Sequence, residues 1–95
     1  MQFDPKQLKN YPQEPGVYMM KNHEGTILYI GKAKNLKVRL KQYFQETDTR
    51  EMIPYLISQI TYIDTIVTPN EKEALILENN LIQREENILI SKKII

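Results

Sequence analysis

The alternation of apolar and polar residues near the N-terminus predicts a β-hairpin. The runs Val17–Lys21 and Thr26–Ile30 are rich in β-branched and aromatic residues, and the segment Asn22–Gly25 between them has the composition of a turn. Side chains that share a face of a strand can be counted in twos. The sets that share a face are Tyr18 and Met20 on the first strand, and Ile27, Tyr29 and Gly31 on the second. The two tyrosines, Tyr18 and Tyr29, are therefore expected on the same face.

Helical spacing and a further β-branched run predict the remaining elements. Asn35 is a good N-cap for a helix that ends at Phe44. The apolar stripe of that helix consists of Leu36, Leu40 and Tyr43. Pro54 fits a short helix only in its first turn. The other expected elements are a short helix within Glu51–Ile60, a strand over Tyr62–Thr68, a helix that ends near Arg84, and a tail over 87–95 that forms either an edge strand or a loose end.

The last helix carries an acidic residue on its apolar side. The helix begins either at the capping box Thr68–Glu71, with Pro69 in the first helical position, or in a second register that uses Asn70 and Glu73. The apolar stripe consists of Ala74, Leu75, Leu77, Leu81 and Ile82. At 100° per residue, Glu78 falls roughly 40° from Ala74, inside that stripe.

Composition excludes several classes of protein and site. Ninety-five residues are enough for one domain. The chain has no cysteine, which excludes disulfides, thiolate nucleophiles and Cys-ligated metals, and a lone His23 cannot build a histidine cluster. Any metal is therefore expected to be held mainly by oxygen atoms. No run of eighteen apolar residues and no secretory signal is present, so a cytosolic protein is expected.

The net charge of +1 hides a segregation of charge along the chain. The segment 25–45 has no acidic residue and contains the cations Lys32, Lys34, Lys37, Arg39 and Lys41. The segment 46–86 carries nine acidic residues against three cations. A basic stretch on an otherwise balanced domain is typical of a surface that binds a phosphate backbone, and the alternative is a solvated helix face.

Glu78 and Arg39 are the two charged residues that a purely structural role explains least well. A carboxylate on an apolar helix face must be paired, protonated or bound to a metal, unless it reaches water at the rim. Mg²⁺ often uses a single protein carboxylate and keeps several waters, so Glu78 is a candidate ligand. Arg39 lies at the edge of its helix stripe and suits a bidentate phosphate clamp. The alternative is an intramolecular ion pair, for which Glu78 is one candidate partner.

Tyr18 and Tyr29 are either core aromatics or participants in proton transfer. The ordinary pKa of a tyrosine is about 10, so the side chain acts as a base only where a cation favours the phenolate. Lys32 follows Tyr29 by three positions and is the expected cation. The chain has neither a glycine-rich phosphate loop nor a Ser-His-Asp arrangement, which leaves phosphate chemistry with one carboxylate.

Two tripeptides carry a resemblance to a known family. Gly16-Val17-Tyr18 and Tyr29-Ile30-Gly31 resemble the motifs of the GIY-YIG endonucleases, with Val17 in place of the first isoleucine. Three further segments extend the similarity: 12–15, 31–40 and 71–82. Together these segments, over residues 8–84, resemble the UvrC branch of the family.

The resemblance implies an α+β fold, a small three-stranded antiparallel sheet flanked by helices. It also implies hydrolysis of a DNA phosphodiester with one divalent ion, Mg²⁺ or Mn²⁺, in the 3′ incision of bacterial nucleotide excision repair. The implied partners are DNA and a UvrB-type subunit. The implied catalytic residues are Tyr18, Tyr29, Lys32, Arg39 and Tyr43, and the implied metal ligand is Glu78. The expected DNA-binding residues are Lys32, Lys34, Lys37, Arg39 and Lys41.

The expected mechanism is in-line attack of water on the phosphodiester. Tyr29, or else Tyr18, helps to deprotonate the water under the influence of Lys32. Arg39 clamps the phosphate, and the ion on Glu78 stabilises the leaving 3′ oxygen. The alternative from another class is a catalytically silent module that keeps the fold and binds DNA or docks a protein.

The chain departs from the family pattern after Arg84. The family continues with a basic stretch, a proline and a Tyr-Asn-Val-like run, whereas this chain reads Glu85-Glu86-Asn87-Ile88. Asn87 is the candidate for the family's site asparagine, at a shorter spacing. We expect one domain over residues 1–95 with a divergent tail at 85–95, as an isolated domain or a shortened homologue.

Overall fold

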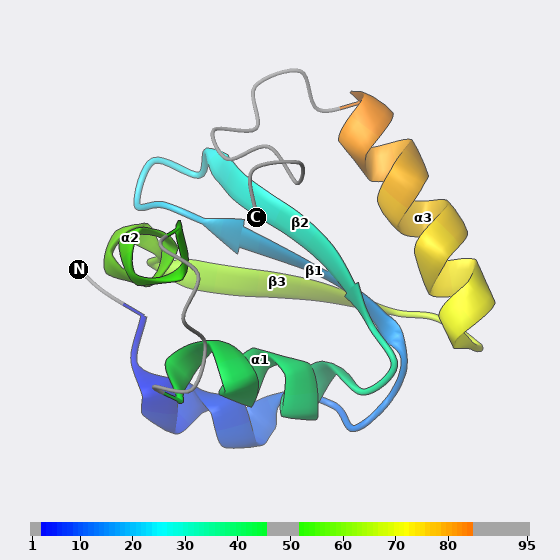
Figure 1. The fold of residues 1–95 in the computed structure, drawn as a ribbon, viewed down its shortest axis with the longest axis horizontal. Helices are drawn as coiled ribbons and strands as arrows, with labels where there is room; N and C mark the ends of the chain where they lie inside the picture. Colours follow the sequence, from blue (N-terminus) through cyan, green and yellow to red (C-terminus); the bar gives the residue numbers. More distant parts are fainter. Residues whose placement is uncertain (1–2, 46–51, 85–95) are drawn as a thin grey trace.

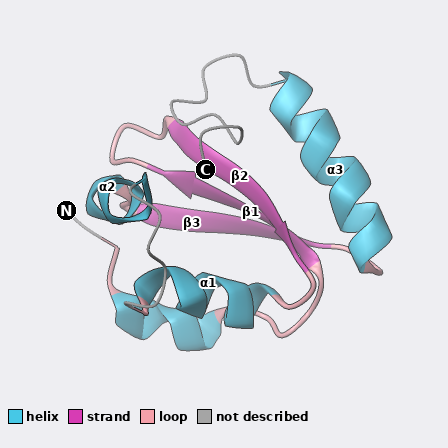
Figure 2. Cartoon of the chain, in the orientation of Figure 1, coloured by secondary structure: helices cyan, strands magenta, loops and turns pink. Residues whose placement is uncertain are grey.

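A computed structural model describes residues 3–45 and 52–84 of the chain and shows the expected α+β architecture. Three strands form an antiparallel sheet in the order β2-β1-β3. Helix α3 lies on one side of the sheet, and η1, α1 and α2 lie on the other (Figures 1 and 2). The elements are η1 Pro5–Asn10, β1 Gly16–Lys21, β2 Ile27–Ala33, α1 Leu36–Phe44, α2 Met52–Gln59, β3 Tyr62–Val67 and α3 Glu71–Arg84. The predicted elements are confirmed; the tail 85–95 lies outside the described residues.

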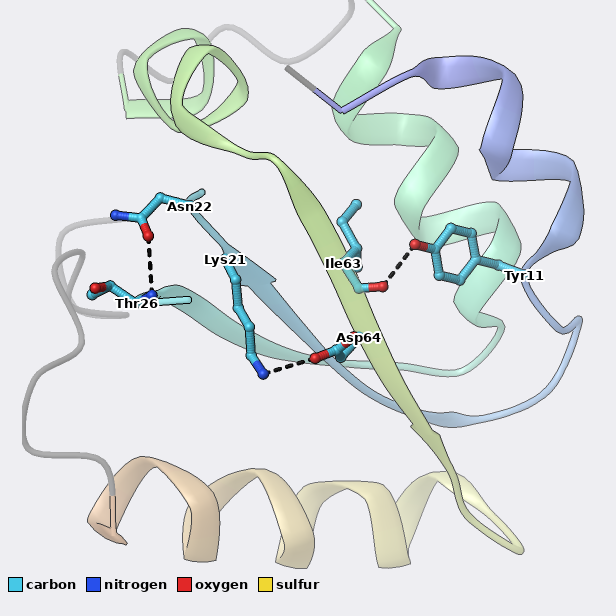
Figure 3. Close-up of polar contacts among 6 residues, drawn as sticks. All are labelled: Tyr11, Lys21, Asn22, Thr26, Ile63 and Asp64. Atoms are coloured by element: carbon cyan, nitrogen blue, oxygen red, sulfur yellow. Dashed lines mark hydrogen bonds and ion pairs between the residues drawn. The ribbon is translucent and has the colours of Figure 1, made fainter. Parts of the chain in front are cut away.

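The hairpin of β1 and β2 is closed by the turn that its composition predicts. Asn22 Oδ1 accepts hydrogen bonds from the backbone N–H groups of Glu24 and Thr26, both at 3.0 Å. Gly25 takes a φ of 84°, a left-handed conformation that costs glycine little because it has no Cβ. Figure 3 shows the bond from Thr26 to Asn22 at this end of the hairpin.

A register shift near the turn changes the face on which Ile27 lies. Met20 pairs with Tyr29, whereas the next residue, Lys21, pairs with Ile27, so Leu28 is passed over. Leu28 is buried in the same cluster as Tyr29, and Ile27 packs in the cluster on the opposite face. The expectation that Ile27 shares a face with Tyr29 is wrong, because an irregularity of one residue inverts the alternation beyond it.

Strand β3 is tied to the rest of the molecule by two side-chain contacts (Figure 3). The Tyr11 hydroxyl donates a hydrogen bond to the Ile63 carbonyl oxygen at 2.7 Å. Lys21 Nζ lies 2.7 Å from Asp64 Oδ2, and these two residues come from the adjacent strands β1 and β3. The two contacts connect β3 to the chain that enters β1 and to β1 itself.

The helix starts follow local side-chain chemistry. Asn35 caps α1, and its Oδ1 accepts a hydrogen bond from the Val38 N–H at 3.1 Å, as predicted. Pro54 is the third residue of α2, within the first turn, also as predicted. Helix α3 uses the second of the two predicted registers. Asn70 Oδ1 accepts from the Glu73 N–H at 2.8 Å, whereas the Thr68 hydroxyl donates to the Asn70 carbonyl oxygen.

Two apolar clusters hold the layers together, one on each face of the sheet. The larger lies between the sheet and α1, α2 and η1, and the smaller lies between the sheet and α3. Burial of a leucine such as Leu36 or Leu40, both 0% exposed, contributes roughly 1.5–3 kcal/mol. Within residues 3–45 and 52–84, every helix is too short or too polar to cross a membrane.

Candidate active site

Three tyrosines meet on the face of the sheet that α1 covers. Tyr18 comes from β1, Tyr29 from β2 and Tyr43 from the buried stripe of α1. The ring centroids of Tyr18 and Tyr29 lie 6.2 Å apart, and those of Tyr18 and Tyr43 lie 5.8 Å apart. The hydroxyl oxygens of Tyr18 and Tyr43 are 2.7 Å apart in a buried hydrogen bond. The prediction that Tyr18 and Tyr29 share a face is confirmed.

Arg39 extends this cluster toward solvent. Its Nη2 donates to the Tyr43 hydroxyl at 3.3 Å, and its Nη1 donates to Gln42 Oε1 at 3.1 Å. The guanidinium carbon lies 4.5 Å from the centroid of the Tyr43 ring, which places the cation over the aromatic face. Gln42 and Tyr43 both belong to α1, the helix that carries Arg39, so α1 itself orients the guanidinium.

Glu78 supplies a negative charge from α3, the helix on the face of the sheet opposite α1. It lies in the middle of α3 and is 1% exposed, and Ala74 one turn earlier is also buried, as the helical spacing predicts. The placement of Leu75 in the same stripe is wrong, because Leu75 lies at the edge of the stripe and is 42% exposed. Burial is the main cause that raises the pKa of Tyr29, and the negative charge of Glu78 adds to it. Helix α3 therefore carries a buried carboxylate whose charge acts on one tyrosine of the cluster that β1, β2 and α1 form.

Burial dominates the acid–base properties of the tyrosines. It raises the pKa of Tyr18 to about 12, although the hydrogen bond with Tyr43 and the charge of Arg39 lower it. Burial raises the pKa of Tyr29 and of Tyr43 still further above the ordinary value. The three hydroxyls are therefore protonated at neutral pH, and they donate or accept hydrogen bonds as neutral phenols.

Lys32 lies on the α3 side of the sheet. It pairs with Val17 in the register of β1 and β2, and Val17 belongs to the cluster under α3. Its Nζ lies 3.7 Å from Glu71 Oε1, at the start of α3. Burial is the main cause that raises the pKa of Tyr29, and the positive charge of Arg39 opposes that rise. The expected influence of Lys32 on Tyr29 stays a prediction.

The remaining cations of the basic stretch lie on the outside of the molecule. Lys34 and Lys41 are exposed and Lys37 is half-buried, at or near α1. The neighbouring Val38 is 47% exposed, so this side of α1 faces away from the core. Asn87 lies outside the described residues.

Three residues at the site have partners that the sequence reading missed. Gln42 accepts a hydrogen bond from Arg39, Glu71 pairs with Lys32, and Gly31 lies opposite Tyr18. The i to i+3 spacing between Arg39 and Gln42 on one helix could have indicated their hydrogen bond. The hairpin register was a usable signal for Gly31. The pairing of Lys32 with Glu71 depends on how α3 packs, which local patterns do not reveal.

The donor set fits a cation that needs few protein ligands. Among residues 3–45 and 52–84, no group of three or more His, Cys, Asp or Glu side chains gathers. Glu78 offers one buried carboxylate, whose charge acts on Tyr29. Mg²⁺ commonly binds one or two carboxylates and keeps several waters, so this arrangement suits Mg²⁺ or Mn²⁺ better than a cation that demands a full protein cage.

Comparison with known proteins gives consistent matches. The family described as the UvrC-like GIY-YIG domain matches residues 14–87. UvrABC system protein C of Protochlamydia amoebophila is 59% identical over 87 residues, which are 90% of this chain and 14% of that protein. The corresponding protein of Syntrophus aciditrophicus is 62% identical over 72 residues, 76% of this chain and 12% of its own length. The chain thus spans about one seventh of the length of the first of these relatives.

A solved structure matches the fold over nearly its whole length. It is the GIY-YIG N-terminal endonuclease domain of UvrC from Thermotoga maritima, bound to its catalytic divalent cation, magnesium. The TM-score is 0.78 and the identity 40%, over 90% of this chain and 93% of that one. A tyrosine-to-phenylalanine variant of the same domain, also bound to the catalytic cation, matches with the same TM-score and 38% identity.

Proposed function

The chain belongs to the UvrC-like GIY-YIG domain family, and on that premise we propose that it is a divalent-metal-dependent DNA endonuclease domain. Its proposed reaction is hydrolysis of a phosphodiester, in the 3′ incision of bacterial nucleotide excision repair. The observation that carries the proposal is the buried Glu78, whose charge acts on Tyr29, together with the tyrosine cluster that Arg39 borders. A buried carboxylate and a guanidinium at one cluster of hydroxyls suit an anionic, oxygen-rich substrate.

Glu78 is the residue that would hold Mg²⁺ or Mn²⁺. A divalent ion bound there supplies Lewis-acid stabilisation of the negative charge that develops on the phosphate oxygens and on the leaving 3′ oxygen. The relative from Thermotoga maritima, whose catalytic cation is magnesium, supports this assignment. Glu78 is the one buried carboxylate among residues 3–45 and 52–84, which is compatible with one ion.

Arg39 is proposed as the phosphate clamp. Gln42 and the Tyr43 hydroxyl hold its two terminal nitrogens, and the Tyr43 ring lies under the guanidinium. A guanidinium fixed in this way loses little conformational freedom when it binds the two oxygens of a phosphodiester. This geometry favours the clamp role.

Tyr29, or else Tyr18, is proposed to orient the attacking water and, once the phenol has lost its own proton to solvent, to accept the proton of that water as the phenolate. A neutral phenol oxygen accepts a hydrogen bond from water, which aligns the water oxygen for attack on phosphorus as the bond to the 3′ oxygen breaks. Proton transfer to the tyrosine requires its phenolate, which burial disfavours and the positive charge of Arg39 favours. Arg39 therefore joins Lys32 as a proposed activating cation. Tyr43 connects Arg39 to Tyr18 through hydrogen bonds.

The basic stretch is proposed to dock the DNA. The DNA-binding residues are Lys34, Lys37 and Lys41 around α1, Arg39 at the site, and Lys32 beside Glu71. Asn87 stays a proposed site residue. We further propose that the domain acts in the cytoplasm as part of a longer protein, with a UvrB-type subunit as partner.

Metal-dependent nicking tests the proposed function. Supercoiled plasmid is incubated with the protein and Mg²⁺ or Mn²⁺, with EDTA as the matched control, alone and with a UvrB-type subunit and damaged DNA. We expect conversion to nicked circles that EDTA abolishes. DNA retention without metal-dependent nicking under every condition would instead identify a catalytically silent binding module.

A further inference from the structure

The Tyr18 ring lies across the backbone of Gly31. The two residues are direct partners in the antiparallel register of β1 and β2, so their side chains would share one face. A Cβ built on Gly31 would meet Cζ and Oη of Tyr18 and would lie 2.9 Å from its Cε1. The far end of the Tyr18 ring therefore occupies the volume that any side chain at position 31 would need.

The backbone of Gly31 does not itself require glycine. Among residues 3–45 and 52–84, the glycine with positive φ is Gly25, in the hairpin turn. Glycine within a strand weakens the strand and often marks a close approach by another group. At position 31 the approaching group is the Tyr18 side chain, so the obstacle to alanine is steric.

The Tyr18 ring has little room to give way. Tyr18 is 1% exposed, and its hydroxyl is engaged with that of Tyr43 at 2.7 Å. The ring centroids of Tyr29 and Tyr43 lie 6.2 and 5.8 Å, respectively, from the ring centroid of Tyr18. A methyl group at position 31 must push the ring toward these neighbours or lift its hydroxyl away from Tyr43.

We propose that Gly31 is a positioning residue: the absence of a side chain at this position sets where the Tyr18 hydroxyl lies against Tyr43 and the rest of the site. Gly31 acts only through Tyr18 and touches no reacting atom. The consequence for catalysis rests on the proposed nuclease function, whereas the placement of the Tyr18 hydroxyl does not. The two parts can therefore be tested separately.

The placement is tested by NMR on protein labelled with ¹³C at tyrosine Cζ. In Gly31→Ala we expect the Tyr18 Cζ resonance and its titration to move, with the exposed Tyr55 unchanged as internal control. An unmoved Tyr18 resonance in a folded Gly31→Ala protein would overturn the proposal.

A stability cycle keeps the test valid if Gly31→Ala folds poorly. Tyr18→Leu removes the end of the ring. The loss of unfolding free energy that Gly31→Ala causes should therefore largely disappear in the Tyr18→Leu background. Gly16→Ala is the matched control, because a Cβ there meets the Ile66 carbonyl oxygen and lies 2.8 Å from Leu36 Cδ1. The loss of unfolding free energy caused by Gly16→Ala should persist in the Tyr18→Leu background. If the loss caused by Gly31→Ala persists equally, the proposal is overturned.

Nicking in the parent and Tyr18→Phe backgrounds tests the catalytic consequence. We expect Gly31→Ala to slow single-turnover nicking by about tenfold with unchanged DNA affinity, and to add less than about twofold in Tyr18→Phe, where no hydroxyl remains to misplace. Equal losses in both backgrounds would show that Gly31 acts by another route. A parent without any nicking would refute the proposed function, and the NMR and stability results would then decide the placement alone.

Discussion

The hydroxyl oxygens of Tyr18 and Tyr43 lie 2.7 Å apart, although one residue belongs to strand β1 and the other to helix α1. Arg39 donates to the same Tyr43 hydroxyl, so a guanidinium at the surface is linked to a buried phenol through one intermediate side chain. Removal of the Tyr43 hydroxyl is therefore expected to disturb both Tyr18 and Arg39.

Tyr43→Phe removes that shared hydroxyl. We expect the free energy of unfolding to fall by about 1 kcal/mol, because the buried Tyr18 hydroxyl loses its partner. Nicking should slow because Nη2 of Arg39 also loses an acceptor. Denaturant unfolding and single-turnover nicking measure the two effects. The control is Tyr55→Phe, at a 54% exposed position, and an equal loss in this control would remove the special role of Tyr43.

Arg39→Lys separates charge from geometry. Lysine keeps the positive charge but lacks the planar fork that Gln42 and Tyr43 hold in place. We expect a normal fold, nearly normal DNA binding and nicking slowed by about tenfold or more, which is about 1.4 kcal/mol of transition-state stabilisation. Single-turnover cleavage of a labelled duplex measures the change in nicking rate. Parent-like cleavage by the lysine variant would exclude Arg39 as a bidentate clamp.

DNA binding is expected to be weak, largely independent of sequence and sensitive to salt. Each phosphate contact made by a lysine contributes roughly 0.9 to the slope of log affinity against log salt on duplex DNA. Substitution of the exposed Lys34 or Lys41 by glutamine should lower that slope by about one contact. The matched control is Lys72→Gln, an exposed lysine on α3. An affinity that does not change across the salt titration would exclude this surface as the DNA-binding site.

Stability should fall at high pH because burial favours the neutral phenols. The folded pKa of Tyr18 is raised from 10.0 to about 12, so the folded state holds its proton where the unfolded chain has lost it. The resulting stabilisation is complete below pH 10 and is lost as the pH rises toward 12. Thermal unfolding at a series of pH values should show this decline. Tyr18→Phe should make it shallower, and an unchanged slope in that variant would contradict the assignment to Tyr18.

The strands and helices could be predicted because they follow local patterns. The Asn35 cap, the stripe that ends at Tyr43 and the position of Glu78 on α3 depend on spacing within one element, and each is confirmed. The register shift at Leu28 depends on how two strands pair, and it moved Ile27 to the other face. The ion pair between Lys32 and Glu71 depends on the packing of α3, which spacing within one element does not reveal.

The central claim is that the buried Glu78 makes this domain a metal-dependent nuclease, and Glu78→Gln tests it most directly. The amide keeps the size of the side chain and removes the charge that would bind the ion. The exposed Glu73→Gln on the same helix is the matched control.

The deciding measurement is single-turnover nicking across a Mn²⁺ titration, with thermal unfolding of the same proteins at each metal concentration. We predict that Mn²⁺ raises the melting temperature of the parent and of Glu73→Gln but not of Glu78→Gln, whose nicking falls by about 100-fold or more. Parent-like nicking and parent-like stabilisation by Mn²⁺ in a folded Glu78→Gln protein would contradict the account.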